Sequence, residues 1–328
     1  MHVTVVVPTY KTRDSINKLM KSLESQSYKD FSVMVIYKPW DGYKQKLDPL
    51  REYDLDIDFV RQPEGFFEEA MNVSYNKADG DVVIHTDDDA YASKKWISDH
   101  VDFHIKHKNV GIATGMVDQS TYPDGRKLSE AAMFVNGQKW RMNDFRLIDG
   151  PIDEKFRGYG MYIGKSGMLV DTGRRHNMIK TFKQHGVNMS WKRDALHGFK
   201  FPGYSRVISR NEQAAALEVI NRKFDAVWFN RGKVFHPLGE SASRTMSTEL
   251  LISDVIFSYY VSRFYDVDLG ILRLRTRISD VLTRIATLNR NCGYEIGYEI
   301  TSSAVRGGWQ PHRVRKEEIA RLFGVGGS

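Results

Sequence analysis

The order of apolar runs and helix-like segments in the first 115 residues constrains the fold more than any other feature of this chain. Residues 2–7 and 31–37 (HVTVVV and FSVMVIY) are almost continuously apolar, as is typical of strands that helices cover on both faces of a sheet. Between them, apolar residues recur at the spacing of an amphipathic helix, at positions Ile16, Leu19, Met20 and Leu23. Further strands are expected near residues 56–60, 81–85 and 110–114, and further helices near residues 65–78 and 94–107. This alternation predicts an α/β fold whose mostly parallel sheet has helices on both faces.

The rest of the chain divides into two further segments. Residues 116–244 have a looser pattern with glycine-rich connections, followed by a helix, a strand and a second strand-like run over residues 212–237. From residue 245 the pattern is helical, with a narrow apolar seam at Ile271, Leu274, Ile278, Val281, Ile285 and Leu288. We expect this seam to pack on its own domain, with a dimer contact or a membrane-surface contact as the alternatives. The sequence thus predicts three segments, which span residues 1–115, 116–244 and 245–328.

The bulk composition is that of a folded, soluble protein without disulfides. The chain has 328 residues, 41% of them hydrophobic, which is enough for a sizeable core. The single cysteine, Cys292, excludes an intramolecular disulfide and a cysteine zinc cluster, and it fits a reducing compartment. The first ten residues are typical of a strand and not of a signal peptide, and no apolar run approaches the length of a membrane span. We therefore expect a cytoplasmic protein, which could lie at the inner face of the membrane.

The net charge of +7 is distributed unevenly along the chain. Residues 1–154 carry 20 Lys and Arg against 26 Asp and Glu, whereas residues 155–244 carry 17 against 6. A basic middle segment attracts anionic ligands such as nucleotide phosphates, an anionic lipid surface or nucleic acid. A solvated basic face is the ordinary alternative. The acidic first half argues against a continuous track for nucleic acid, so no specific nucleic-acid partner is expected.

Three consecutive carboxylates, Asp87, Asp88 and Asp89, follow the strand expected at residues 81–85. Adjacent like charges repel one another, so a positive partner is expected close by. Residues two apart in an extended chain face the same way, so Asp87 and Asp89 can converge on one ligand while Asp88 points elsewhere. Two carboxylates at a strand end suit Mg²⁺ or Mn²⁺ that is held partly by substrate phosphates. The ordinary alternative is a group of surface acids in a turn.

Four short motifs occur in order along the chain: VVVPTY at residues 5–10, Ala70 with Asn72, ADGD at residues 78–81, and the Asp-x-Asp of residues 87–89. Together they resemble the family 2 inverting glycosyltransferases of the GT-A fold, and the likeness extends over about residues 3–240. The resemblance implies a Rossmann-like, mostly parallel sheet with helices on both faces, followed here by a C-terminal helical region. It also implies that Mn²⁺ or Mg²⁺ bridges the diphosphate of a nucleotide sugar. Asp87 would then lie near the ribose and the metal, and Asp89 would be a metal ligand.

A later stretch, residues 210–236, resembles the catalytic part of the same family, in which Glu-Asp begins a helix and a histidine follows a pair of strands. Here Asn211 and Glu212 stand in place of Glu-Asp, and His236 stands in place of the histidine. The resemblance implies that Glu212 is the catalytic base and that His236 is a third metal ligand or a phosphate contact. Without it, Glu212 would be an acid favoured by the dipole at a helix start, and His236 would more often be structural. Arg244 lies in a small-residue loop that could close over the diphosphate or be a plain linker.

The chain departs from the family pattern after the second expected strand, where Tyr37 and Lys38 stand in place of carboxylates. Either Asp41, from a shifted loop, or Tyr37, by stacking, could contact the nucleotide base. The resemblance implies a donor site that includes Pro8, Thr9, Tyr10, Tyr37, Asp41, Asn72, Asp87, Asp88 and Arg244. The donor would be a UDP-, GDP- or dTDP-sugar, and the acceptor a glycan or a lipid-linked or protein-linked molecule.

The predicted reaction is a single displacement with inversion. A carboxylate accepts the proton of the attacking hydroxyl, while a cation and basic groups stabilise the leaving nucleoside diphosphate. A haloacid-dehalogenase-type phosphohydrolase is one alternative, because its strand also runs into Asp-x-Asp, although Tyr91 stands where that motif has Thr or Val. A non-catalytic polyanion-binding protein is the other, and an oligomer is compatible with each of these interpretations.

Overall fold

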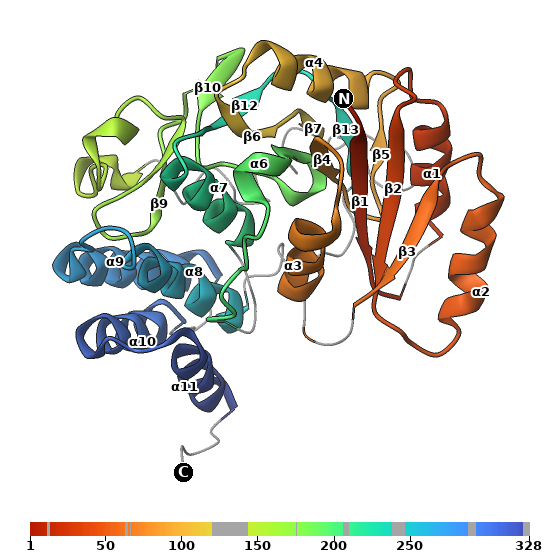
Figure 1. Cartoon of the computed structure of the whole chain (residues 1–328). Coiled ribbons are helices and arrows are strands. Elements are labelled where there is room, and N and C mark those ends of the chain that lie inside the picture. Colours follow the sequence, from red (N-terminus) through yellow and green to blue (C-terminus); the bar gives the residue numbers. More distant parts are fainter. Residues whose placement is uncertain are drawn as a thin grey trace. The chain divides into compact units, whose positions relative to one another are not determined.

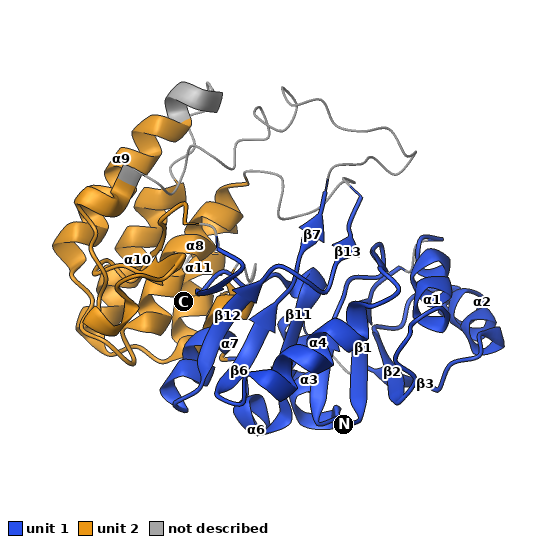
Figure 2. Cartoon of the chain, turned by 90° about the horizontal axis from the view of Figure 1, so that it is seen from above, with its two compact units in different colours: residues 1–130, 175–201, 215–239 blue, residues 131–174, 202–214, 240–328 orange. Residues whose placement is uncertain are grey.

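The computed structural model describes residues 1–11, 14–62, 65, 67–119, 144–174, 176–205, 210–237, 247–287 and 293–323. These residues form two compact units, each built from segments that are separated in the sequence (Figure 2). Unit 1 contains residues 1–130, 175–201 and 215–239, and unit 2 contains residues 131–174, 202–214 and 240–328. The three functional segments expected from the sequence, with ends at residues 115 and 244, remain a prediction.

Unit 1 is built around an eight-stranded sheet with the order β10-β12-β6-β11-β4-β1-β2-β3 (Figure 1). Its strands are β1 (Val3–Thr9), β2 (Phe31–Tyr37), β3 (Ile57–Arg61), β4 (Val82–His85), β6 (Val110–Thr114), β10 (Met178–Lys180), β11 (Met189–Lys192) and β12 (Asp225–Phe229). Neighbours among β1 to β4 run parallel, as do β6 and β12. Strand β11 lies antiparallel between β4 and β6, and β10 is antiparallel to β12. The predicted α/β fold with a mostly parallel sheet is therefore confirmed.

The helices of unit 1 include those expected from the sequence as well as two short ones, α2 and α6, that were not expected. They are α1 (Ile16–Glu24), α2 (Tyr43–Leu47), α3 (Phe67–Lys77), α4 (Trp96–Lys106), α6 (Arg193–Leu196) and α7 (Asn211–Asn221), together with the 3₁₀ turns η1 (Asp48–Glu52) and η4 (Gly186–Asn188). The first turn of α7 belongs to unit 2 and the remainder to unit 1. Helices α1, α3 and α4 confirm the three helices expected in the first 115 residues.

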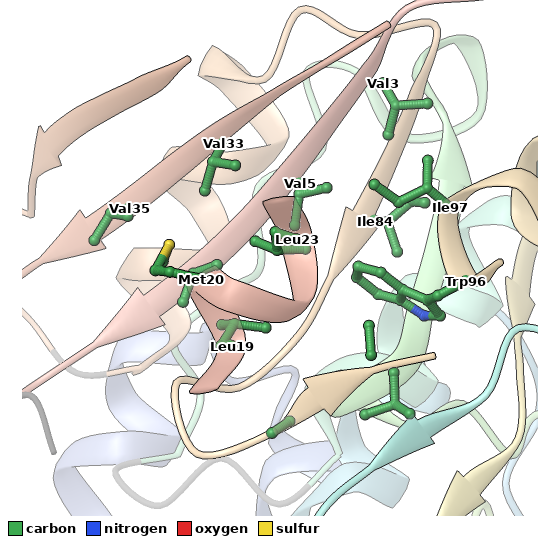
Figure 3. Packing of buried hydrophobic residues seen from close by; sticks show 14 of the residues in the cluster. Val3, Val5, Leu19, Met20, Leu23, Val33, Val35, Ile84, Trp96 and Ile97 are labelled. Atoms are coloured by element: carbon green, nitrogen blue, oxygen red, sulfur yellow. The ribbon is translucent and has the colours of Figure 1, made fainter. Parts of the chain in front are cut away.

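The core on one face of the sheet forms where α1 and α4 pack on alternate residues of the central strands. This cluster joins the expected apolar side of α1 to the sheet and to α4 through the fully buried side chains of Leu19, Met20, Leu23, Val5, Val33, Ile84 and Trp96 (Figure 3). Burial of each such leucine stabilises the fold by about 1.5–3 kcal/mol. The cluster fixes the strands whose carboxyl ends carry the acidic motif.

The opposite face of the sheet is covered by α3. The ring of Tyr75 lies 5.4 Å from that of Trp191 in β11 and 6.3 Å from that of His85 in β4. His85 faces this side because its neighbour Ile84 faces the other, as the alternation of a strand requires. Burial lowers the pKa of His85 to about 3, so its imidazole is neutral at pH 7.

Unit 2 consists of a short hairpin and a group of helices. Its elements are η2 (Asp144–Leu147), η3 (Glu154–Phe156), β8 (Met161–Ile163), β9 (Leu169–Asp171), α8 (Thr248–Val261), α9 (Leu269–Thr287), α10 (Gly293–Gly307) and α11 (Pro311–Phe323). Its apolar cluster joins α8, α9 and α10 to the hairpin through Met168, Leu251, Val255, Leu272 and Tyr294. Helices α8 and α10 approach closely, since a side chain at Gly297 would meet Val255 at 2.7 Å. The predicted C-terminal helical region is confirmed.

Helix α9 does not pack through the apolar seam that the sequence suggested. Leu274 is 47% exposed and Val281 is 56% exposed, while Ile271 and Ile278 are only half-buried. The side chains of the last two seam positions, 285 and 288, lie outside the described residues. The inward side of α9 instead carries Leu272, Arg275, Thr276, Asp280 and Thr283. The expectation that the seam packs on its own domain is therefore wrong for Leu274 and Val281, while Ile271 and Ile278 are buried only in part.

A buried ion pair explains this orientation of α9. The guanidinium of Arg275 donates to the carboxylate of Asp149 at 2.5 Å and to the carbonyl oxygen of Leu169 at 2.9 Å. Burial lowers the pKa of Arg275, and the Asp149 carboxylate opposes this effect. The hydroxyl of Ser166 donates to the same carboxylate at 2.5 Å. Because a charge without its partner is costly inside a protein, this pair holds the polar side of α9 inward.

None of the helices in the described part of the chain combines the length and the apolar character that crossing a bilayer requires.

Candidate active site

The three aspartates follow β4 at its carboxyl end, between the ends of β1 and β11. The chain turns there, with the amide of Ala90 donating to the carbonyl oxygen of Asp87 at 3.2 Å. All three aspartates are partly exposed, whereas the preceding Thr86 is buried. Ligands of parallel sheets bind at the carboxyl ends of strands, so the position is that of a ligand site.

Asp88 is turned towards β1 and the segment that follows it. The hydroxyl of Thr9, the last residue of β1, donates to a carboxylate oxygen of Asp88 at 2.5 Å. The hydroxyl of Ser15 donates to the carbonyl oxygen of Asp88 at 3.4 Å. The side chain of Asp88 therefore points away from the side chains of Asp87 and Asp89, as the sequence analysis predicted.

His236 joins the other two aspartates. Its Nε2 atom lies 3.0 Å from Oδ1 of Asp89 and 3.8 Å from Oδ2 of Asp87. The three side chains can present one ligand atom each, and these atoms lie within 4.8 Å of one another. Asp87 and Asp89 thus converge as expected. They are joined by His236, which belongs to the last sequence segment of unit 1, residues 215–239.

A three-stranded sheet brings His236 to the aspartates. Strand β13 (Val234–Phe235) pairs antiparallel with β5 (Tyr91–Ala92) and parallel with β7 (Val117–Asp118). The rings of Tyr91 and Phe235 stack, with centroids 5.0 Å apart and planes inclined by 11°. Since Asp89 stands two residues before β5 and His236 directly follows β13, antiparallel pairing of the two strands places these side chains together.

Gln119 also contacts His236, although no motif in the sequence predicts this contact. Its side-chain amide nitrogen lies 3.4 Å from Nδ1 of His236. Gln119 directly follows β7, so the same sheet brings it to the site. A metal-ligating histidine donates from its far ring nitrogen, so the Gln119 amide would turn its oxygen towards Nδ1 when Nε2 binds a metal. Only the pairing of two-residue strands reveals this neighbour.

A buried polar network supports the loops that lead into β7 and β13. The side-chain amide of Asn188 donates to the carbonyl oxygens of Met116 and Gly232, both at 2.7 Å. Its Oδ1 atom accepts from Trp96 at 2.8 Å and lies 3.0 Å from Nε2 of His100. Gly232 has a φ of +61°, and a side chain there would meet the His100 ring at 2.8 Å, so only glycine fits.

The donor set fits a divalent cation. Two carboxylates and one imidazole are ligands that Mn²⁺ accepts, and oxygen ligands with substrate phosphates suit Mg²⁺. The side chains of Asp87, Asp89 and His236 are 38%, 25% and 11% exposed, so they are accessible to a ligand. A cation between the two carboxylates would also remove their mutual repulsion.

Aromatic side chains stand beside the carboxyl ends of β1 and β2. The rings of Tyr37 and Tyr43 stack at 5.4 Å, the rings of Trp40 and Tyr43 lie 6.0 Å apart, and Trp40 meets Tyr10 edge-on at 6.4 Å. Tyr10 is 58% exposed, and Asp41 in the same loop is exposed as well. Tyr37, which the sequence analysis proposed for stacking on the nucleotide base, is therefore one member of a cluster of four aromatic rings.

Two further candidate donor residues lie in structured positions. Pro8 is half-buried near the end of β1, in register with Ile36 of β2. Asn72 in α3 is buried, where its Oδ1 atom accepts from the amide of Phe201 at 2.7 Å and its nitrogen donates to Glu69 at 3.2 Å. Contact of Pro8 or Asn72 with a donor remains a prediction. Arg244 lies outside the described residues.

Glu212 occupies the first turn of α7, in the part of that helix that belongs to unit 2. The side-chain oxygen of Asn211 accepts from the amide of Glu212 at 2.9 Å, which satisfies one donor of the helix start. The preceding Arg210 donates to Asp254 of α8 at 2.7 Å. Burial lowers the pKa of Arg210, but the Asp254 carboxylate outweighs burial, so that this pKa is raised overall. The carboxylate of Glu212 is thus held on an anchored helix start.

Comparisons with known proteins agree with this fold. The sequence model of the glycosyl transferase family 2 matches residues 4–163. No curated protein sequence matches the chain. Among solved structures, a mannosyltransferase from Pyrobaculum calidifontis in complex with GDP-Man and Mn²⁺ is 14% identical, with a TM-score of 0.54 over 99% of this chain and 88% of that one.

Two other structures have a similar fold. S. aureus TarS is 14% identical, with a TM-score of 0.54 over 97% of this chain, which spans 53% of TarS. GalNAc-T7 with UDP, GalNAc and Mn²⁺ is 13% identical, with a TM-score of 0.55 over 88% of this chain and 57% of that one. The hydrolase and the non-catalytic alternatives have no support from these matches. Residues 4–163 thus carry a glycosyl transferase family 2 domain, and the chain has the GT-A fold of these solved glycosyltransferases.

Proposed function

We propose that this chain is a glycosyltransferase that depends on a divalent cation and moves a sugar, with inversion, from a nucleotide sugar to a hydroxyl of an acceptor. The observation that carries the proposal is the convergence of Asp87, Asp89 and His236 at the carboxyl end of β4. Support also comes from the mannosyltransferase solved with GDP-Man and Mn²⁺ and from TarS solved with UDP-GlcNAc. The acceptor would be a glycan or a lipid-linked or protein-linked hydroxyl compound.

Asp87, Asp89 and His236 would hold Mn²⁺ or Mg²⁺, with Asp87 also near the ribose. The bound cation would neutralise charge on the diphosphate as it leaves. Gln119, which lies at the ring nitrogen opposite the carboxylates, would keep the His236 ring in place by accepting from Nδ1 through its amide oxygen. The hydroxyl of Thr9 donates to the carboxylate of Asp88. This hydrogen bond would hold Asp88 in place and so position the backbone between Asp87 and Asp89.

The nucleotide base would lie against the aromatic cluster of Tyr10, Tyr37, Trp40 and Tyr43. Aromatic side chains stack on any base, since every base presents a π-face. The exposed Tyr10 and the partly exposed Trp40 offer the available ring surface, whereas Tyr37 already stacks on Tyr43. This arrangement favours a donor site that accepts UDP-, GDP- or dTDP-sugars, with weak selection at the base.

Glu212 would act as the general base. It would accept the proton of the acceptor hydroxyl while the new bond forms to the anomeric carbon and the bond to the diphosphate oxygen breaks. The leaving group departs from the opposite side of that carbon, so the configuration inverts. A carboxylate held by an anchored helix start suits this role, because Arg210 and Asn211 restrict the movement of the first turn.

The experiment is a transfer and hydrolysis assay with Mn²⁺ and a panel of nucleotide sugars. We expect Glu212→Gln to lower kcat by about 100-fold to 10,000-fold, as the loss of a general base does. Glu218→Gln is the matched control, because Glu218 lies on the same helix and pairs with Arg222. Magnetic resonance of the product reports the anomeric configuration. Full activity of Glu212→Gln, or retention of configuration, contradicts the proposed mechanism.

A further inference from the structure

The outward side of α9 is an apolar stripe, formed by Ile271, Leu274, Ile278, Val281 and Leu282. Leu274, Val281 and Leu282 are 47%, 56% and 37% exposed, and the two isoleucines are half-buried. These positions recur every three or four residues, so they share one side of the helix. From the first to the last, the stripe is about 16 Å long at the rise of an α-helix.

Arginines flank the stripe on one side. Arg273 and Arg277 are exposed and lie four residues apart, in the turns that also carry Leu274 and Ile278. The one acid in the described part of α9, Asp280, is buried at 5% exposure. The outward surface of α9 therefore combines apolar side chains with positive charge and no exposed carboxylate of its own.

The orientation of α9 makes this surface a fixed feature of unit 2. Arg275 points inward to Asp149 and stacks over the ring of Phe145 at 4.5 Å. Leu272 packs in the cluster with Leu251 and Val255 of α8. Rotation of the helix to bury the stripe would break these contacts and leave the Asp149 charge without its partner inside the unit.

We propose that the α9 stripe docks on an anionic lipid surface, with the helix axis parallel to the membrane. Such helices insert an apolar side at the level of the headgroups, while arginines at the edge reach the lipid phosphates. Charge complementarity selects this occupant over a second copy of the chain. In a two-fold contact the arginines of both copies would meet at an interface to which α9 brings no exposed acid.

The test is sedimentation of the purified full chain with vesicles. One set contains phosphatidylcholine and phosphatidylglycerol in equal parts, and the other contains phosphatidylcholine alone. We expect binding to the anionic vesicles that weakens with added salt, and far less binding to the neutral ones. Arg277→Gln should weaken anionic-vesicle binding by about fivefold, which is the contribution of one arginine near such a surface.

A double variant, Leu274→Glu with Val281→Glu, should lower vesicle binding by more than about tenfold, since it removes apolar insertion and adds like charge. Ile105→Glu is the control, because Ile105 is 52% exposed on α4 in the other unit. Unfolding curves show whether each variant is folded, and sugar-nucleotide hydrolysis without vesicles should be unchanged, so the outcome is independent of the proposed reaction.

Two results overturn the lipid proposal. The first is equal vesicle binding of the folded double variant and the wild-type chain. The second is a wild-type dimer in light scattering that the double variant converts to a monomer, together with no binding to anionic vesicles. In that case the stripe is an interface between copies.

Discussion

The Nε2 atom of His236 lies 3.0 Å from Oδ1 of Asp89, although 147 positions separate the two residues in the sequence. The contact depends on strands of two residues each, which pair the segment after the acidic motif with the segment before the histidine. Strands this short contribute little stability by themselves, so the stacked rings of Tyr91 and Phe235 and the buried Asn188 network maintain the geometry.

Replacement of His236 tests whether it belongs to a cation site. We expect Mn²⁺ with a nucleoside diphosphate to raise the melting temperature of the wild-type chain, because a ligand of the folded state stabilises it. His236→Ala and Asp89→Asn should lose most of this rise, while each folded variant keeps its unfolding transition in the absence of ligand. His312→Ala, at an exposed position of α11, should keep the full rise. Equal rises in His236→Ala and the wild type would show that the histidine is not a ligand.

Substitution in the aromatic cluster distinguishes stacking from acid recognition of the base. Trp40→Ala should raise the donor KM by about 5-fold to 150-fold, with kcat little changed, since one base stack contributes about 1–3 kcal/mol. Asp41→Asn should leave the KM near its original value. Steady-state kinetics with two donors that differ in their base distinguish stacking on Trp40 from recognition of the base by Asp41. A large effect of Asp41→Asn on one donor alone assigns base recognition to that carboxylate instead.

Much of this fold follows from the sequence because the central strands are buried on both faces. The run from Phe31 to Tyr37 is apolar except for Ser32, and it forms β2 with both ends as expected. The apolar positions of α1 identified the side that packs on the sheet. In both segments the local pattern and the tertiary environment require the same residues.

Other features could not be predicted because they depend on distant pairing. Strand β11 lies antiparallel between β4 and β6, and its four residues, Met189–Lys192, alternate apolar and polar side chains, a pattern too short to predict a central strand. The apolar seam of α9 identified one side of a helix but not the environment that it faces. There the ion pair between Arg275 and Asp149, 126 positions apart, decided the orientation.

Acid should destabilise unit 1 through two buried histidines of α4. Burial lowers the pKa of His100 to about 4 and that of His104 to about 3. In the unfolded chain these imidazoles bind protons below their ordinary pKa of 6.5, whereas in the folded chain they stay neutral. The free energy of unfolding therefore falls as the pH falls from 6.5 towards about 4. Each histidine contributes up to about 1.4 kcal/mol per pH unit in this range.

Urea unfolding measured across this pH range tests the histidine prediction. His104→Gln keeps a side chain that can donate to Ser190, which lies 2.9 Å from the imidazole in the wild type. Its free energy of unfolding should fall less steeply with acid than that of the wild type, by about one proton. An unchanged slope in the folded variant would mean that His104 does not carry the effect.

Replacing one member of the buried Arg275–Asp149 ion pair should cost more stability than replacing both members. Arg275→Met should lower the free energy of unfolding by about 3–5 kcal/mol, because Asp149 is left as a buried charge. Arg275→Met with Asp149→Leu should recover much of that loss, since no unpaired charge remains. Arg277→Met, on the exposed side of the same helix, should change stability by less than about 0.5 kcal/mol. Equal stability of the single and the double variant contradicts this account of α9.

The most direct test of the central claim is the anomalous diffraction of Mn²⁺ in crystals that also contain a nucleoside diphosphate. We predict a single strong peak about 2–2.5 Å from oxygen atoms of Asp87 and Asp89, from Nε2 of His236 and from the diphosphate. A bound nucleotide with no peak among these three side chains, or a peak held by other residues, would contradict the proposed cation site.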